Sequence, residues 1–188
     1  MQRVFQFPTF PMRDPAITTS AVPDLAALVA QGTAAVAAQT DVPADTFAHP
    51  DRLALVDDAA ATRRAHLACF IEDLAVAQWY EARRGAPTVV TSYSMGLYPA
   101  LVFVGALRLA DALRIMQCAC DAAHASAGPG PFAMLAITGP DGAAVAELIA
   151  LEAPLVECTD RYALDTHLLT GRLSEVQAIQ RAATARGW

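Results

Sequence analysis

The sequence predicts an α/β fold in two parts, the second of which is a ferredoxin-like unit lacking its last strand. A β-rich run at 88–92 passes directly into a helical pattern from Met95 onward, which indicates a strand, a tight turn and a helix. Beyond a linker at 126–131, the pattern reads strand, helix, strand, strand, helix. That order is the ferredoxin-like βαββαβ unit without its final element.

The first part of the chain begins with a strand at 3–7, because Pro8 follows this short apolar run and cannot continue a strand interior. Apolar residues then recur at helical spacing in several stretches. The sequence RRG at 83–85 marks the end of the longest stretch, since a cationic last turn followed by glycine is a typical helix terminus. We expect helices at 24–38, 64–83, 95–105 and 108–124, and a loop with one short helix at 41–58.

The run SAGPGP at 126–131 is the clearest linker in the chain, because glycine and proline interrupt both helices and strands. It divides an N-terminal domain, residues 1–127, from a small C-terminal domain, residues 132–188. The elements expected in the small domain are strands at 132–138, 155–158 and 163–170 and helices at 141–152 and 174–185.

Composition excludes several classes of function. The chain has 188 residues, of which 55% are hydrophobic and 17% charged, which is typical of a globular protein of about one domain. Its net charge of −6 argues against nucleic acid as a partner, because such binding depends on neutralising phosphates. The sequence contains neither lysine nor asparagine. A Schiff-base lysine, a phosphate-binding P-loop and an N-glycosylation site are therefore excluded.

The four cysteines do not have the spacing of a metal site, so we expect them to be reduced, buried and structural. No signal peptide and no membrane-spanning run is evident. These features predict a cytoplasmic protein that binds neither a metal nor a membrane. The cysteines are Cys69, Cys118, Cys120 and Cys158.

The sequence SYSMG at 92–96 lies where the predicted strand turns into a helix. A nucleophile elbow has the pattern G-x-S-x-G, in which small residues allow a sharp turn that exposes the serine hydroxyl. Here Ser92 replaces the first glycine, and Ser94 is the central serine. The alternative interpretation is an ordinary helix N-cap by Ser92 or Ser94.

The continuation of this motif, SMGLYPALVFVGALRLADALR at 94–114, resembles the nucleophile region of malonyl-CoA:acyl carrier protein transacylases. That family carries the run G-H-S-x-G-E-Y-x-A-L-x-x-x-G-x-x-x-x-x-D-A-x-R. The opening VFQFP at 4–8 resembles the family's first strand, TRRAHL at 62–67 its T-Q-P-A-L-L helix start, and the part after Phe132 its inserted ferredoxin-like subdomain. The residues in register are Tyr98, Ala100, Leu101, Gly105, Asp111, Ala112 and Arg114.

The resemblance implies a partial α/β-hydrolase-like core with a ferredoxin-like small subdomain. It implies that Ser94 is the nucleophile and that the backbone amide of Met95 donates to the oxyanion. The acyl group would pass from coenzyme A to the phosphopantetheine thiol of an acyl carrier protein, in fatty acid or polyketide assembly. The acyl-CoA and the carrier are substrates in this scheme, and no cofactor is bound.

The sequence departs from the family pattern at several positions of the site. TFPMR at 9–13 replaces the G-Q-G-x-Q loop, and Tyr93 and Leu97 replace the histidine and glutamate that flank the nucleophile. The arginine that pairs with a malonyl carboxylate falls at Ala119, so malonyl specificity is not supported. Arg63 stands where the family has glutamine. Arg63, Tyr93 and the position of Ala119 remain the candidate substrate-binding residues.

The family's catalytic histidine belongs to an S-H motif beyond the region of resemblance, and none of the four histidines matches it. His66 is the candidate base within the chain. Three hypotheses follow. The protein is an acyltransferase whose site is completed by a second chain or by another subunit of a homo-oligomer; or it is a catalytically degenerate homologue that acts as a docking subunit; or it is a serine hydrolase of acyl thioesters that uses His66.

Overall fold

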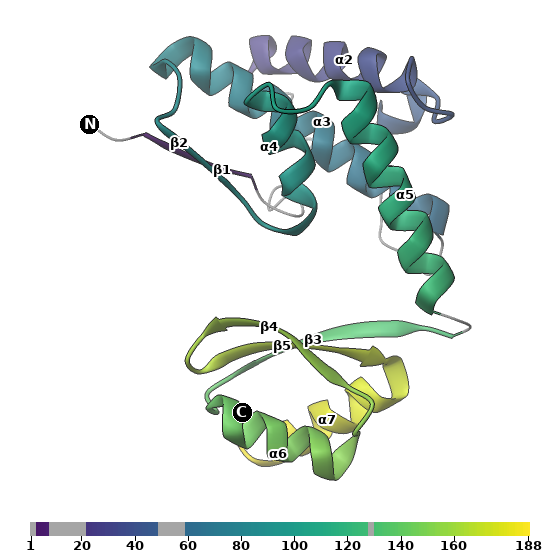
Figure 1. The fold of residues 1–188 in the computed structure, drawn as a ribbon, viewed down its shortest axis with the longest axis vertical. Coiled ribbons are helices and arrows are strands. Elements are labelled where there is room, and N and C mark those ends of the chain that lie inside the picture. Colours follow the sequence, from purple (N-terminus) through teal and green to yellow (C-terminus); the bar gives the residue numbers. More distant parts are fainter. Residues whose placement is uncertain (1–2, 8–21, 49–58, 128–129) are drawn as a thin grey trace. The chain divides into compact units, whose positions relative to one another are not determined.

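The computed structural model describes residues 3–7, 22–48, 59–127 and 130–188 (Figure 1). The chain forms two compact units, Met1–Ser126 and Ala127–Trp188. The loop at 9–13 and His49 lie outside the described residues.

The first unit contains a small parallel sheet and a group of helices. The strands are β1 (Val4–Phe7) and β2 (Val89–Ser92), and the helical segments are α2 (Pro23–Ala37), η1 (Ala44–Ala48), α3 (Ala59–Arg84), η3 (Ser94–Gly96), α4 (Leu97–Phe103) and α5 (Leu109–Ala127).

The expected helices are present, with corrected ends. Helix α3 begins at Ala59, five residues before the expected start, because alanine-rich sequence extends it. The helix expected at 95–105 instead begins with the 3₁₀ turn η3 and ends at Phe103. Gly105 adopts a φ of 73°, a left-handed conformation that ends the helix. Helix α5 continues to Ala127, so His124 lies inside its last turn.

Strands β1 and β2 pair in parallel, and only one face of their sheet is covered in the described structure. Phe5, Phe7 and Val90 pack against α3 and α4 through Ala77, Ala100 and Phe103. On the opposite face, the register partners Val4 and Val89 are 58% and 38% exposed. Parallel sheets are normally buried on both faces, so it is unusual that these apolar side chains are exposed.

The larger core of the first unit lies around the middle of α3. Leu67, Phe70 and Ile71 of this helix pack with residues of α2, of α5 and of the segment that follows Ser94. Helix α2 approaches closely because Gly32 has no side chain: a Cβ there would lie 3.1 Å from Ile71 Cγ2. This core holds the beginning of α4 against α3.

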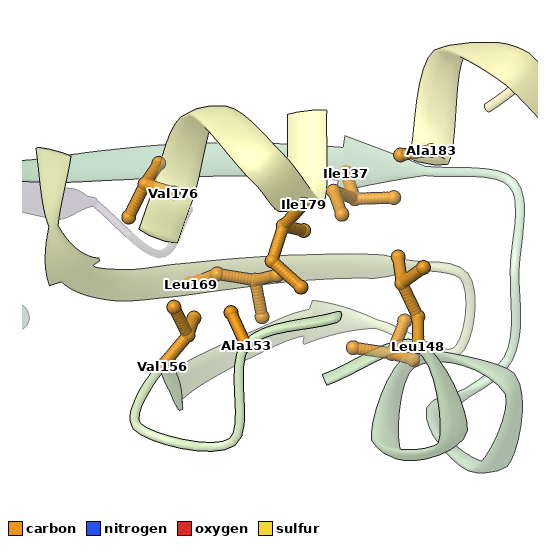
Figure 2. Close-up of a cluster of buried hydrophobic side chains, with 9 residues drawn as sticks. Ile137, Leu148, Ala153, Val156, Leu169, Val176, Ile179 and Ala183 are labelled. Atoms are coloured by element: carbon orange, nitrogen blue, oxygen red, sulfur yellow. The ribbon is translucent and has the colours of Figure 1, made fainter. Parts of the chain in front are cut away.

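The second unit is an antiparallel sheet of order β3-β5-β4 with two helices on one face (Figures 1 and 2). This order and the βαββα succession are those of a ferredoxin-like unit without its fourth strand. Nine buried side chains, including Leu148, Leu169 and Ile179, fill the space between sheet and helices (Figure 2). The elements are β3 (Phe132–Thr138), α6 (Gly142–Glu152), β4 (Glu157–Ala163), β5 (Thr166–Arg172) and α7 (Leu173–Ala185).

The expected bounds of the last two strands were wrong. The strand expected at 155–158 is β4 at Glu157–Ala163, and the one expected at 163–170 is β5 at Thr166–Arg172. The apolar residues Leu155 and Val156 suggested a strand, but the polar sequence that follows forms the ladder with β5. Pairing with a buried neighbour therefore outweighed local hydrophobicity.

The expectation that all four cysteines are buried was wrong. Cys69 is buried, Cys120 and Cys158 are half-buried, and Cys118 is exposed. None of the described helices is both long and apolar enough to cross a membrane.

Candidate active site

Ser94 lies in a sharp turn between β2 and the helical segment that follows. Tyr93 is extended, with φ −133° and ψ 133°, and Ser94 then reverses the chain with a φ of 50°. Of the non-glycine residues that the structure describes, Ser94 alone has a positive φ. This left-handed conformation costs about 1–2 kcal/mol for an L-residue, so the surrounding contacts must hold it in place.

Two backbone hydrogen bonds and a small buried residue fix this turn. The Tyr93 amide donates to the Phe7 carbonyl at 3.1 Å, and the Gly96 amide donates to the Tyr93 carbonyl at 3.0 Å. Gly96, which follows Met95, is buried. The amide of Met95 belongs to the first helical turn, where a backbone N–H has no acceptor within the helix.

The structure does not support the interpretation of the two serines as helix caps. Tyr93 occupies the N-cap position of η3 and Gly96 that of α4, and neither helix has a side-chain cap hydrogen bond. The Ser94 side chain is exposed, and its hydroxyl makes no hydrogen bond within the described residues. Ser94 is thus an exposed serine with a left-handed backbone conformation between a strand and a helical segment.

A second group of polar side chains lies between α3 and α5. The His66 Nδ1 atom is 3.5 Å from the Cys120 Sγ atom. Burial lowers the pKa of His66, so its neutral form is favoured. Burial raises the pKa of Cys120, the Asp121 carboxylate raises it further, and the Arg63 guanidinium lowers it. Arg63 therefore lies close enough to act on this thiol.

Arg63 forms an ion pair with Asp41, which lies between α2 and η1. The Nη2 atom of Arg63 is 2.6 Å from Oδ1 of Asp41, and the side chains are 20% and 72% exposed respectively. This hydrogen bond holds the pKa of Asp41 below its usual value. Arg63, a candidate substrate-binding residue, is thus paired with a specific carboxylate.

The structure brings together some of the predicted site residues. Tyr93, Ser94 and Met95 share one turn, whereas Arg63 and His66 share one face of α3. No described hydrogen bond joins the Ser94 hydroxyl to His66. Ala119 is exposed on α5, next in sequence to Cys120.

Sequence reasoning missed two features of α3 and its surroundings. Cys120 was expected to be a core thiol, and nothing in its spacing indicated contact with His66. Asp73 is a half-buried carboxyl whose pKa burial raises to about 7, with a further contribution from the charge of Glu72. Two adjacent acids in an otherwise apolar stretch were the available signal. In the described part of the chain, no group of three or more potential metal ligands occurs.

Comparison with solved structures identifies the fold. The malonyl-CoA:acyl carrier protein transacylase of Xanthomonas oryzae superimposes with a TM-score of 0.80 and 22% identity, covering 100% of this chain and 60% of that one. A malonyl transacylase in complex with the acyl carrier protein of a type II polyketide synthase gives 0.78 and 20%, with coverages of 100% and 60%. The acyltransferase domain of the polyketide synthase PpsC of Mycobacterium tuberculosis gives 0.77 and 20%, with coverages of 97% and 54%.

The chain therefore has the fold of malonyl transacylases and polyketide synthase acyltransferase domains, and it spans about 60% of the length of the transacylases. No family model matches the sequence, and neither does any curated protein.

Proposed function

We propose that this protein takes part in acyl transfer from a coenzyme A thioester to the phosphopantetheine thiol of an acyl carrier protein, with Ser94 as the nucleophile. The observation that carries this proposal is the φ of 50° at Ser94, between β2 and η3, in a fold shared with acyltransferases. Strain of this kind is retained where it positions a reacting group.

The proposed reaction has two balanced steps. The Ser94 oxygen attacks the thioester carbonyl carbon, a base accepts the hydroxyl proton, and the oxyanion accepts a hydrogen bond from the Met95 amide. The C–S bond then breaks, and the coenzyme A thiolate leaves with the proton. In the second step the carrier thiol attacks the serine ester, which regenerates Ser94 and leaves the acyl group on the carrier.

We propose that the base comes from a complementary chain or from another subunit of a homo-oligomer. Two observations support this proposal. The Ser94 hydroxyl has no hydrogen-bond partner among the described residues. The sheet of β1 and β2 leaves Val4 and Val89 exposed on a face that parallel sheets normally bury. A partner covering this face would also approach the carboxyl ends of the strands, where Ser94 lies.

The alternative is a degenerate homologue that binds a carrier protein without catalysing transfer. The unpartnered Ser94 hydroxyl favours it as well, because an inactive site needs no base. A solved complex of a malonyl transacylase with its acyl carrier protein supports the carrier as the partner. A hydrolase that uses His66 receives less support, since the described contact of His66 is with Cys120 rather than with Ser94.

Intact mass spectrometry after incubation with acetyl-CoA, malonyl-CoA and longer acyl-CoAs tests the proposal. We expect an acyl adduct on the wild type and on Ser92→Ala, a matched control two residues away, and none on Ser94→Ala. An adduct that survives Ser94→Ala would contradict the assigned nucleophile. If no thioester acylates the wild type, either the base lies on an absent complementary chain or the site is inactive, and binding of a carrier protein in a titration would then favour the docking alternative.

A further inference from the structure

Arg63, His66 and Cys120 lie one helical turn from the residues that hold the Ser94 turn in place. Leu67, Phe70 and Met116 pack in the cluster that also contains Met95. Each polar residue is four positions from one of these: Arg63 from Leu67, His66 from Phe70, and Cys120 from Met116. Residues four apart share a helix face, separated by one turn of about 5.4 Å.

The polar cluster also lies beyond the carboxyl ends of the strands. The rings of Phe5 and Tyr80 are in contact, with centroids 6.3 Å apart, and Phe7 packs with Ala77 in the same hydrophobic cluster. Strand β1 therefore runs along α3 from the C-terminal end of this helix toward its N-terminal end. The Ser94 turn continues in the same direction. Ligands of α/β sheets bind outside the carboxyl ends of the strands. The polar cluster therefore lies on the side of the sheet where a thioester bound at Ser94 would be held.

The charges of this cluster do not favour an anion. Arg63 supplies a guanidinium, but Asp41 binds it at 2.6 Å. The Asp121 carboxylate is also close enough to act on Cys120. The Arg63 charge is therefore neutralised by Asp41, and Asp121 adds a second negative charge to the cluster. An incoming carboxylate would have to displace Asp41 or share the guanidinium with it, against like-charge repulsion.

The other members of the cluster add no positive charge. Burial lowers the pKa of His66, which favours a neutral imidazole, and raises the pKa of Cys120, which favours a neutral thiol. Neutral groups of this kind suit a hydrocarbon chain better than an ion.

We propose that the Arg63–Asp41 ion pair is a specificity determinant that makes the acyl end of this site select an uncharged acyl group over one that ends in a carboxylate. The inference rests on the proposed function, because it assumes that the Ser94 turn receives an acyl thioester. In this scheme Asp41 neutralises the charge of Arg63 and keeps the guanidinium from binding a substrate carboxylate.

Equilibrium binding of two nearly isosteric thioesters to the full chain tests the proposal. Isovaleryl-CoA carries an isopropyl group where malonyl-CoA carries its carboxylate. We expect calorimetric titration to show that isovaleryl-CoA binds about tenfold more tightly than malonyl-CoA, because burying the malonyl carboxylate without a partner costs free energy. Asp41→Asn frees the Arg63 guanidinium and should reduce the ratio of isovaleryl-CoA affinity to malonyl-CoA affinity about fivefold or more. Asp45→Asn removes an exposed charge from the neighbouring η1 and should leave this ratio unchanged.

Two further variants test whether the freed guanidinium is what binds the malonyl carboxylate. The double variant Asp41→Asn/Arg63→Gln should lose the gain in malonyl-CoA affinity, which would assign the gain to Arg63. Ala119→Arg adds an uncompensated cation at an exposed position of α5 and should raise malonyl-CoA affinity even if Asp41→Asn fails to fold.

The possible failures are distinguishable. Equal or tighter binding of malonyl-CoA by the wild type overturns the specificity inference and leaves the proposed function standing. An Asp41→Asn variant that folds and has the wild-type ratio of the two affinities also overturns the specificity inference. Absence of binding by both thioesters overturns the proposed function and this inference with it.

Discussion

The backbone amide of Tyr93 donates a hydrogen bond to the carbonyl of Phe7 across 3.1 Å. This bond joins the ends of β1 and β2 immediately before the chain reverses at Ser94. The strained residue is therefore anchored on one side by the sheet and on the other by the packing of Met95 against the core cluster of α2, α3 and α5. The conformation of the turn therefore depends on the pairing of two distant segments as well as on the sequence of the turn itself.

Replacing Ser94 with glycine should stabilise the protein. Glycine adopts a φ of 50° without steric cost, whereas serine does not. We expect Ser94→Gly to raise the free energy of unfolding by about 0.5–1 kcal/mol, measured in urea, while it removes the nucleophile. Ser92→Gly, in the extended end of β2, should instead destabilise. Destabilisation by Ser94→Gly would show that the turn carries no strain.

Asp73 should make the stability of the protein depend on pH between about 4 and 7. Burial raises its pKa to about 7 in the folded state, above the ordinary value of 3.8. Between these values the folded state holds a proton that the unfolded state has lost, so stability falls as pH rises through this window. Asp73→Asn should flatten the dependence and raise stability at pH 8 by about 1–2 kcal/mol, a figure reduced for partial solvent exposure.

The measurement is urea unfolding at pH values from 4 to 8. The exposed Glu152 gives a matched control, since Glu152→Gln removes a carboxylate without altering α3. An Asp73→Asn profile that parallels the wild type would contradict the assignment. Glu72, whose pKa burial also raises, remains in the variant and accounts for any residual slope.

Gly171 should not tolerate alanine. A Cβ at this buried position of β5 would lie 2.8 Å from Val156 Cγ2, closer than side chains approach in folded proteins. We expect Gly171→Ala to destabilise the second unit by about 1–3 kcal/mol, and Val156→Ala to recover part of the loss in the double variant. Gly142→Ala is the control, because its nearest contacts are 3.6–3.7 Å and alanine favours the first turn of α6. Equal effects of the two substitutions would contradict this assignment.

The protein should associate in solution. The face of the first sheet that carries Val4 and Val89 is exposed, and β3, at an edge of the second sheet, has no charged residue along its seven positions. Uncharged strand edges of this length pair readily with another copy. We expect sedimentation at micromolar concentration to give a mass above the 19.8 kDa of a single chain.

A lysine on the edge strand should reduce this association. Met134 of β3 and Leu151 of α6 are 64% and 65% exposed, so they form a matched pair. We expect Met134→Lys to shift the distribution toward single chains and Leu151→Lys to leave it unchanged. A monodisperse wild-type monomer would contradict the prediction.

Local sequence was sufficient for much of the fold. Helical periodicity identified α2, α3, α5 and α7, and the glycine and proline residues between 126 and 131 identified the region in which one compact unit gives way to the next. Hydrogen bonds within helices and the conformational limits of glycine and proline act over a few residues, so the amino-acid order is enough to predict them.

Long-range pairing decided what local sequence left open. The bounds of β4 and β5 depend on their mutual register, which placed a polar segment in the sheet. The contact of His66 with Cys120 joins residues 54 positions apart, and the ion pair of Arg63 with Asp41 joins a helix to a loop. The burial that raises the pKa of Asp73 is likewise a property of the assembled helices.

The sequence by itself thus determined the element types, the linker and the serine within a strand-to-helix motif, because these depend on neighbouring residues. Tertiary structure decided the strand register, the positive φ of Ser94 and the charge balance around Arg63. These depend on which distant groups are brought within a few ångströms, and electrostatic and packing energies change steeply over that range.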